Sequence, residues 1–263
     1  MFRILVPTDF SENAFKAVEY VFEHFRAERV KLILIHTIRA PHSAAGVLIR
    51  IDDLMRQDAE RDMEQLVELI KSSHNVEVES IIKIGHLTDW VKQYAQVYKI
   101  DLVCMGTKGE SNLSNRLLGS VTESVIKSAR IPILVVPSTG DTPPIRRVAI
   151  ATPLGDLNDQ NYIKRFMGSL SLENPHINVI RVLKDRDKQS PKSIDIDGYQ
   201  IGIETVYNNS ITEGICSYVD EFPTDLLIMY HSHTGKWASI FTKSVTIGVC
   251  GKINIPLLVL PLK

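Results

Sequence analysis

Residues 102–126 read LVCMGTKGESNLSNRLLGSVTESVI, which is an apolar run, a loop that contains glycines, and then a helix pattern. The apolar run is short enough for a buried strand. For the helix, we expect Ser120 to be the N-cap and to form a capping box with Glu123. In a parallel sheet, loops that join a strand to a helix are where phosphates bind, so this loop is the first candidate site.

The loop carries three glycines, Gly106, Gly109 and Gly119. Glycine lets bare backbone approach a ligand, and the helix that follows offers free N–H groups and a partial positive charge to an anion. The spacing G-x2-G-x9-G-S is neither a Walker P-loop nor a G-x-G-x-x-G fingerprint. The plain alternative is that the glycines only shape a turn and a cap.

Strands and helices alternate through the first half of the chain. This alternation predicts an α/β fold with right-handed crossovers and a doubly wound parallel sheet, in strand order 3-2-1-4-5. Strands one and four are then neighbours where the order reverses, so Pro7-Thr8-Asp9 and the glycine loop flank one crevice. The expected strands are 3–6, 32–35, 76–84, 102–105 and 131–137, and the expected helices are 14–25, 51–70, 91–98 and 121–126.

The chain then repeats itself. Residues 101–137 align without gaps on residues 225–261, with Ser120-Val121-Thr122 matching Ser244-Val245-Thr246. A repeat of this length predicts two copies of one five-stranded fold. We expect a first domain, a linker and a degenerate second domain at 1–138, 139–146 and 147–263.

The second copy lacks the site. Tyr230, His233 and Lys243 replace the three glycines, and Pro153 replaces Asp9. Gly235-Lys236 is at best half a P-loop, and His231 with His233 could be metal ligands or a packed loop. The second copy also lacks the long helix: a hairpin around Asp197-Gly198 is predicted in its place, with a disordered insertion as the alternative.

Composition limits the class of protein. A net charge of −1 gives no field that would attract nucleic acid or an anionic membrane, and 44% hydrophobic residues is ordinary for a soluble protein. No apolar run reaches membrane-spanning length and no signal peptide is visible, so the cytoplasm is the expected location. Cys104, Cys216 and Cys250 show no C-x-x-C spacing and are expected to be buried thiols.

The glycine spacing resembles the nucleotide signature of the universal stress protein family, and both halves resemble its members. The resemblance implies ATP in the first half, with Mg²⁺ as a charge partner although no ligand cluster for it is visible. Asp9, beside Pro7 and Thr8, would contact the nucleoside, and Thr37 would offer its backbone to adenine. The phosphates would be held by Gly106, Gly109, Gly119, Ser120 and Val121, with Met105 lining the crevice, Thr122 at its edge, and Lys108 adding charge or lying in solvent.

Three functions stay open: an ATP-binding regulatory protein in the stress response, a slow ATP hydrolase, and a nucleotide-free scaffold. No histidine or carboxylate is assignable as the base that hydrolysis requires. The expected partners are an adenine nucleotide and an unidentified protein, with no nucleic acid and no membrane. The halves are expected to pair as a pseudo-dimer through residues 133–136 and 257–260, because an apolar edge strand needs a cover; a larger oligomer or a further homodimer is the alternative.

Overall fold

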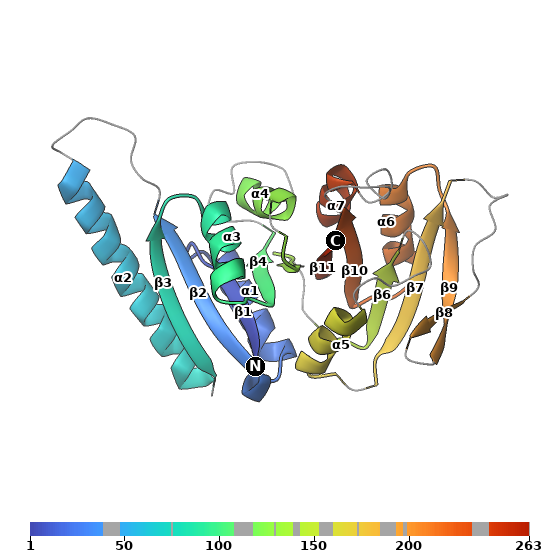
Figure 1. The fold of residues 1–263 in the computed structure, drawn as a ribbon, viewed down its shortest axis with the longest axis horizontal. Helices are drawn as coiled ribbons and strands as arrows, with labels where there is room; N and C mark the ends of the chain where they lie inside the picture. Colours follow the sequence, from blue (N-terminus) through green and yellow to red (C-terminus); the bar gives the residue numbers. More distant parts are fainter. Residues whose placement is uncertain are drawn as a thin grey trace.

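A computed structural model describes residues 1–38, 48–74, 76–107, 118–128, 130–138, 143–152, 160–172, 174–184, 193–196, 199–232 and 242–262. Within these residues, one sheet of eleven strands runs through the molecule (Figure 1). The first half contains β1 (Phe2–Pro7), α1 (Glu12–His24), β2 (Val30–Ile38), α2 (Leu48–Ser73), β3 (Glu77–Ile84), α3 (Leu87–Val97), β4 (Leu102–Gly106), α4 (Ser120–Ser128) and β5 (Ile133–Val136). The second half contains β6 (Arg147–Ala151), α5 (Gln160–Ser169), β7 (His176–Leu183), β8 (Ser193–Ile196), β9 (Tyr199–Tyr207), α6 (Ile211–Glu221), β10 (Leu226–Ser232), α7 (Lys243–Cys250) and β11 (Leu257–Leu262).

The strand order is β3-β2-β1-β4-β5-β11-β10-β6-β7-β9-β8. The first five strands are parallel and confirm the predicted order 3-2-1-4-5. The second half has the same order in reverse, with β8 added at its outer edge. The prediction of two tandem doubly wound domains is therefore confirmed.

Consecutive residues of the strands point into two separate cores. Ile4 of β1 joins the cluster beneath α1, α2 and α5, whereas its neighbour Leu5 joins the cluster beneath α3, α4, α6 and α7. Both clusters contain residues from both halves. The apolar character of the strands follows from this arrangement, since parallel strands covered on both faces have no solvent side.

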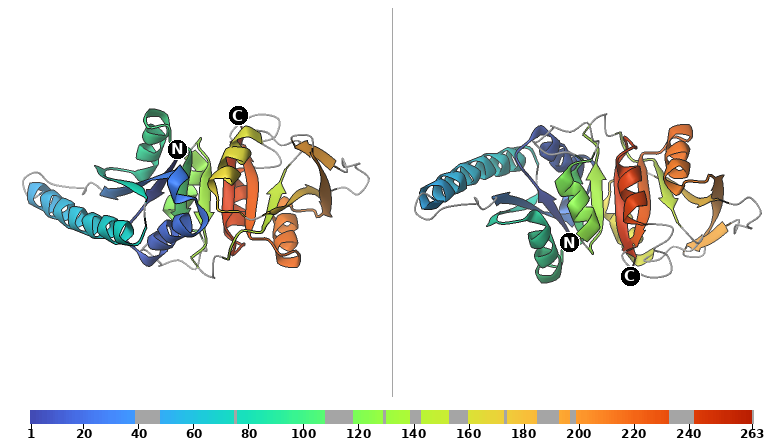
Figure 2. Two further views of the ribbon diagram at one scale, coloured as in Figure 1. Left: turned by 90° about the horizontal axis from the view of Figure 1, so that it is seen from below. Right: turned by 90° about the horizontal axis from the view of Figure 1, so that it is seen from above.

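The halves meet where β5 and β11 pair antiparallel, with Val135 opposite Leu257 and Ile133 opposite Val259. This pairing confirms the predicted pseudo-dimer through the last strands. Figure 2 shows α4 and α7 side by side at the centre of the molecule, on either side of this seam.

A second junction was not foreseen from the sequence. Phe25 and Leu170, just after α1 and α5, form an antiparallel bridge. Beside it, Arg26 N–H donates to Ser169 O at 2.9 Å and Ser171 N–H donates to His24 O at 2.7 Å. The first helix of each half therefore contacts its counterpart across the pseudo-two-fold.

The predicted hairpin is confirmed. β8 pairs antiparallel with β9 from Ser193–Gly202 to Ile196–Tyr199, and the turn between them, 197–198, lies outside the described residues. In the first half the same connection is α2, a helix of 26 residues. Figure 1 shows α2 flanking one end of the sheet and the hairpin forming the other.

All three cysteines are buried, as expected. Burial raises the pKa of Cys216 to about 11 and of Cys250 to about 12. Among the helices that the structure describes, none is long and apolar enough to cross a membrane.

Candidate functional site

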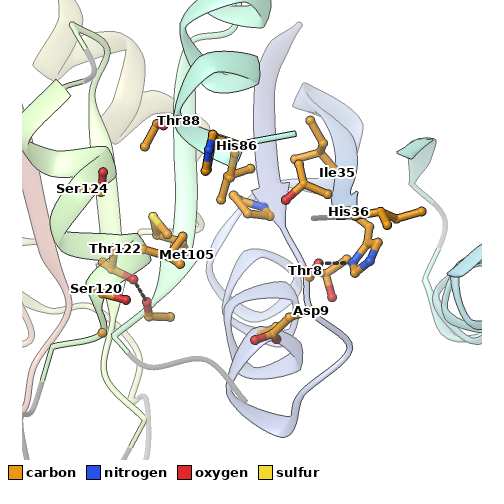
Figure 3. Close-up of a pocket in the computed structure, with 18 of the residues that line it drawn as sticks. Thr8, Asp9, Ile35, His36, His86, Thr88, Met105, Ser120, Thr122 and Ser124 are labelled. Atoms are coloured by element: carbon orange, nitrogen blue, oxygen red, sulfur yellow. Dashed lines mark hydrogen bonds between the residues drawn. The ribbon is translucent and has the colours of Figure 1, made fainter. Parts of the chain in front are cut away.

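A pocket of about 600 Å³ opens at the carboxyl ends of β1, β2 and β4 (Figure 3). Its volume is within the range of small-molecule sites. Ten of the twelve predicted site residues line it: Pro7, Thr8, Asp9, Thr37, Met105, Gly106, Gly119, Ser120, Val121 and Thr122. Lys108 and Gly109 lie outside the described residues. The predicted crevice therefore exists, and it is built from strand ends that are far apart in the sequence.

One wall of the pocket was missed by the sequence reasoning. It consists of Gly85–Thr88, which run from the end of β3 into the first turn of α3, together with His36 and Met55. Gly85 has φ of 118°, a conformation that favours glycine, and its N–H donates to Ile38 O at 2.9 Å. The available signal was that the third strand ends at Gly85 on the same edge of the sheet as Asp9.

Asp9 is held by the turn that starts α1. Ser11 Oγ donates to Asp9 Oδ1 at 2.5 Å, and Ser11 N–H donates to the same oxygen at 3.2 Å. Ser11 Oγ also accepts from Ala14 N–H at 3.2 Å, so Ser11 is the N-cap of α1. Phe10, between them, has φ of 62°, and its N–H donates to Thr8 Oγ1 at 3.0 Å. The carboxylate is thus fixed in direction by its own turn.

The end of β2 presents peptide groups to the pocket. Ile35 O accepts from Thr8 N–H on the β1 side, and Ile38 O accepts from Gly85 N–H on the β3 side, both at 2.9 Å. Because successive residues of a strand direct their N–H and C=O groups toward opposite neighbours, Thr37 directs its N–H and C=O toward the β1 side, as Ile35 does. The register of β1 with β2 ends at Pro7 and Ile35, so Thr37 extends beyond that ladder into the pocket.

His36 forms part of the same wall. Its Nδ1 lies 2.8 Å from Thr8 O, and its ring stacks on Phe10 with centroids 4.6 Å apart. A carbonyl oxygen only accepts, so Nδ1 carries the hydrogen. These contacts connect the ends of β1 and β2.

The glycine side of the pocket differs from prediction by one residue. Glu123 N–H donates to Gly119 O at 2.9 Å, so Gly119 occupies the N-cap position and Ser120 is the first residue of α4. The predicted Ser120 cap and capping box are therefore wrong, and the Glu123 carboxylate pairs with Lys127 instead. With glycine at the cap, the first N–H groups of α4 project from a backbone without an intervening side chain.

Two further hydrogen bonds join the end of β4 to the start of α4. Gly119 N–H donates to Thr107 O at 2.7 Å, and Thr122 Oγ1 donates to Gly106 O at 2.9 Å. They hold the end of β4 against the start of α4, which brings Gly106 and Gly119 to the same side of the pocket. The arrangement is a set of backbone donors at a helix N-terminus, which suits an anion such as phosphate.

In the second half, side chains occupy the equivalent place. Tyr230 stands where the first half has Gly106, and it is 1% exposed in the core beneath α5. His231, also 1% exposed, bonds through Nδ1 to Thr246 Oγ1 at 3.0 Å. Pro153, His233 and Gly235-Lys236 lie outside the described residues, and within the described part no cluster of three His, Cys, Asp or Glu could hold a metal.

Comparison with known proteins gives a consistent result. The sequence model of the universal stress protein family matches residues 1–137. Universal stress protein MJ0577 of Methanocaldococcus jannaschii is 32% identical over 154 residues, which cover 51% of this chain and 93% of that protein. MJ0531 of the same organism is 29% identical over 140 residues, covering 51% and 81%.

One solved structure is similar over both halves. The crystal structure of a universal stress protein from Archaeoglobus fulgidus covers 98% of this chain and 96% of its own, with a TM-score of 0.70 and 18% identity. At that identity the likeness shows the fold alone, and it shows it for the whole chain.

Proposed function

This chain belongs to the universal stress protein family, and we propose that its first half binds ATP. The observation that carries the proposal is the pocket at the ends of β1, β2 and β4, where ten predicted residues converge. We propose that the second half binds no nucleotide, because the side chains of Tyr230 and His231 are buried at the place where bare backbone would have to approach a phosphate.

The strand order supports a nucleotide as the ligand. Thr37 on β2 offers a donor and an acceptor side by side, which complement N1 and the 6-amino group of adenine. Gly106 and Gly119, beyond β4, offer backbone donors for phosphate. β1 lies between them and Asp9 follows its end, so the ribose falls between base and phosphates. Base, sugar and phosphate then follow the order β2-β1-β4.

We propose a regulatory role in the cytoplasmic stress response, with nucleotide occupancy as the signal. Asp9 is the carboxylate among the described pocket residues, and the strand order assigns it to the sugar, away from the phosphates. Mg²⁺ would be held chiefly by the phosphates and water, as it commonly is. The proposed domains are 1–138 and 147–263, joined by a linker at 139–146.

Calorimetry with ATP tests the proposal. We expect about one site per chain, with weaker binding of GTP, and the nucleotide content of freshly purified protein gives an independent measure. Two equivalent sites would contradict the assignment to the first half. Phosphate release followed over hours separates a regulatory protein, which retains ATP, from a slow hydrolase. If no nucleotide binds, the nucleotide-free scaffold is the remaining function.

A further inference from the structure

Ser11 does more than cap α1. Its Oγ accepts from Ala14 N–H at 3.2 Å, as a cap does, and donates its own hydrogen to Asp9 Oδ1 at 2.5 Å. Its backbone N–H reaches the same carboxylate oxygen at 3.2 Å. Among the described residues that line the pocket, Asp9 is present and Ser11 is not. Ser11 therefore lies behind Asp9 and acts on the pocket only through it.

Two hydrogen bonds to one oxygen fix the rotation of a carboxylate. A hydroxyl bond of 2.5 Å to an ionised carboxylate belongs to the short, charge-assisted class. With Oδ1 held by Ser11, the position of Oδ2 is defined as well. Figure 3 shows Asp9 between His36 and Thr8 on one side and Ser120 and Thr122 on the other.

We propose that Ser11 is a positioning residue that aims the Asp9 carboxylate at the ribose hydroxyls of the bound nucleotide. The inference rests on the proposed nucleotide site. An ionised carboxylate only accepts hydrogen bonds, and it repels phosphate. With adenine at Thr37 and phosphates at Gly106, the nucleotide groups that can donate to Asp9 are the sugar hydroxyls. The site therefore selects ribonucleotides over deoxyribonucleotides, and Ser11 sets the strength of that selection.

The second half provides a matched control. Ser210 caps α6 by accepting from Glu213 N–H at 3.3 Å, and its N–H donates to Asn208 Oδ1 at 2.9 Å. This turn has the same Asx–x–Ser form as Asp9-Phe10-Ser11. It differs in carrying a neutral amide, and no bond joins the described side chains of Ser210 and Asn208. A change at Ser210 therefore reproduces the loss of a cap without touching a pocket carboxylate.

The experiment compares ATP, 2′-deoxyATP and 3′-deoxyATP on wild type, Ser11→Gly and Ser210→Gly by calorimetry. Glycine is an accepted N-cap, so the fold of Ser11→Gly should persist. We expect Ser11→Gly to lower the affinity for ATP about tenfold, because the Asp9 carboxylate is then no longer oriented to accept a hydrogen bond from the ribose. For the deoxynucleotide that lacks the hydroxyl bound by Asp9, we expect a change of about twofold or less. Ser210→Gly should leave the affinities for all three nucleotides unchanged.

Ser11→Thr, which keeps the hydroxyl, should retain the affinity for ATP. In an Asp9→Asn background, Ser11→Gly should have no further effect on ATP binding. If Ser11→Gly does not fold, Ser11→Asn keeps a cap and removes the hydroxyl hydrogen without adding a charge, and the loss of affinity should again be larger for ATP than for the deoxynucleotide. Equal losses for all three nucleotides, or no loss, would overturn the role of Ser11. Wild type that fails to bind ATP would instead overturn the proposed function.

Discussion

The two halves of this chain share a scaffold and differ in a crevice. Asp101 and Asp225 immediately precede the equivalent strands β4 and β10, and their carboxylates accept the backbone N–H of Arg3 and of Arg147, at 2.9 and 2.8 Å. A ring pair at the end of α3 and of α6 is duplicated as well: Tyr94 stacks on Tyr98 with ring centroids 4.6 Å apart, and Tyr218 lies tilted against Phe222 with centroids 4.8 Å apart. The contacts that hold the sheet together therefore occur twice.

The crevice shows what can change without loss of that scaffold. In the first half Thr122 bonds to Gly106 O, while in the second its counterpart Thr246 bonds to the buried His231. The same helix position thus braces bare backbone in one half and a packed side chain in the other. The comparison separates residues that build the fold from residues that open a site.

The seam gives the largest expected effect. Val135 and Val259 are 1% and 3% exposed in β5 and β11. Lysine at either position would place an ammonium group in an apolar interface shared by both halves, and we expect a loss of about 4 kcal/mol or more in the free energy of unfolding. Urea unfolding followed by circular dichroism measures it. Val97→Lys, at a position 65% exposed, is the control, and a stable Val135→Lys or Val259→Lys protein would show that the seam is not a shared core.

The crevice can be changed by copying one half into the other. Gly106→Tyr introduces the residue found at Tyr230, and its ring would fill the space where phosphate needs backbone. We expect the affinity for ATP to fall by at least about a hundredfold, measured by calorimetry, with the fold retained. Tyr230→Phe should leave binding unchanged. Binding that survives Gly106→Tyr would mean that the phosphates do not reach β4.

The carboxylate of Asp225 allows a pH experiment. Burial alone would raise the pKa of Asp225, but hydrogen bonds from the Arg147 side chain and from the backbone N–H groups of Arg146 and Arg147 outweigh it, and the pKa lies below the usual 3.8. When the pKa of a carboxyl is lower in the native state than in the unfolded state, the ionised group stabilises the fold. That stability is fully present at a pH above the unfolded-state pKa and is lost as the pH falls through the native-state pKa. Asp225→Asn should cost about 2 kcal/mol of unfolding free energy at pH 7.

That cost should shrink as the pH is taken below the usual aspartate value of 3.8, where the wild-type carboxylate also becomes protonated. Denaturant unfolding of wild type and variant at pH 7 and in the acid range measures the difference. A cost that does not depend on pH would assign the effect to packing.

The smallest effect is expected at an ion pair between the halves. Arg165 of α5 lies 2.9 Å from Asp101, but its side chain is 59% exposed. Exposed pairs contribute little, so Arg165→Met should cost about 0.5 kcal/mol, and the cost should fall further in high salt. Thermal unfolding at two salt concentrations is sufficient to measure it. A loss of several kcal/mol would mean that this contact, and not the strand seam, holds the halves together.

The positions of the strands, the repeat and the hairpin could be predicted because each follows from patterns within the sequence. Apolar runs of strand length, an ungapped internal alignment and the Asp197-Gly198 dipeptide are all visible in the sequence. Pro7-Thr8-Asp9 and the glycine loop followed from the rule that ligands bind where strand order reverses. Thr37, Met105, Val121 and Thr122 came instead from the resemblance to the universal stress protein family.

What could not be predicted depends on geometry between distant residues or on a single hydrogen bond. The bridge between Phe25 and Leu170 joins two chain segments that carry no shared sequence signal. The start of α4 was misplaced by one residue because Ser120 has good capping chemistry, whereas the acceptor of the first helical bond is Gly119. The Gly85–Thr88 wall required knowledge of how far each strand extends beyond its neighbour.

The antiparallel seam between β5 and β11 also changes how this assembly responds to dilution. In a dimer of separate chains, pairing of the last strands is bimolecular, so the fraction paired and the melting temperature depend on protein concentration. Here both strands belong to one chain, and each is held near the other at an effective concentration set by the linker. Pairing within the chain is therefore unimolecular, and its midpoint of unfolding should be the same in a dilute cell extract as in a concentrated sample.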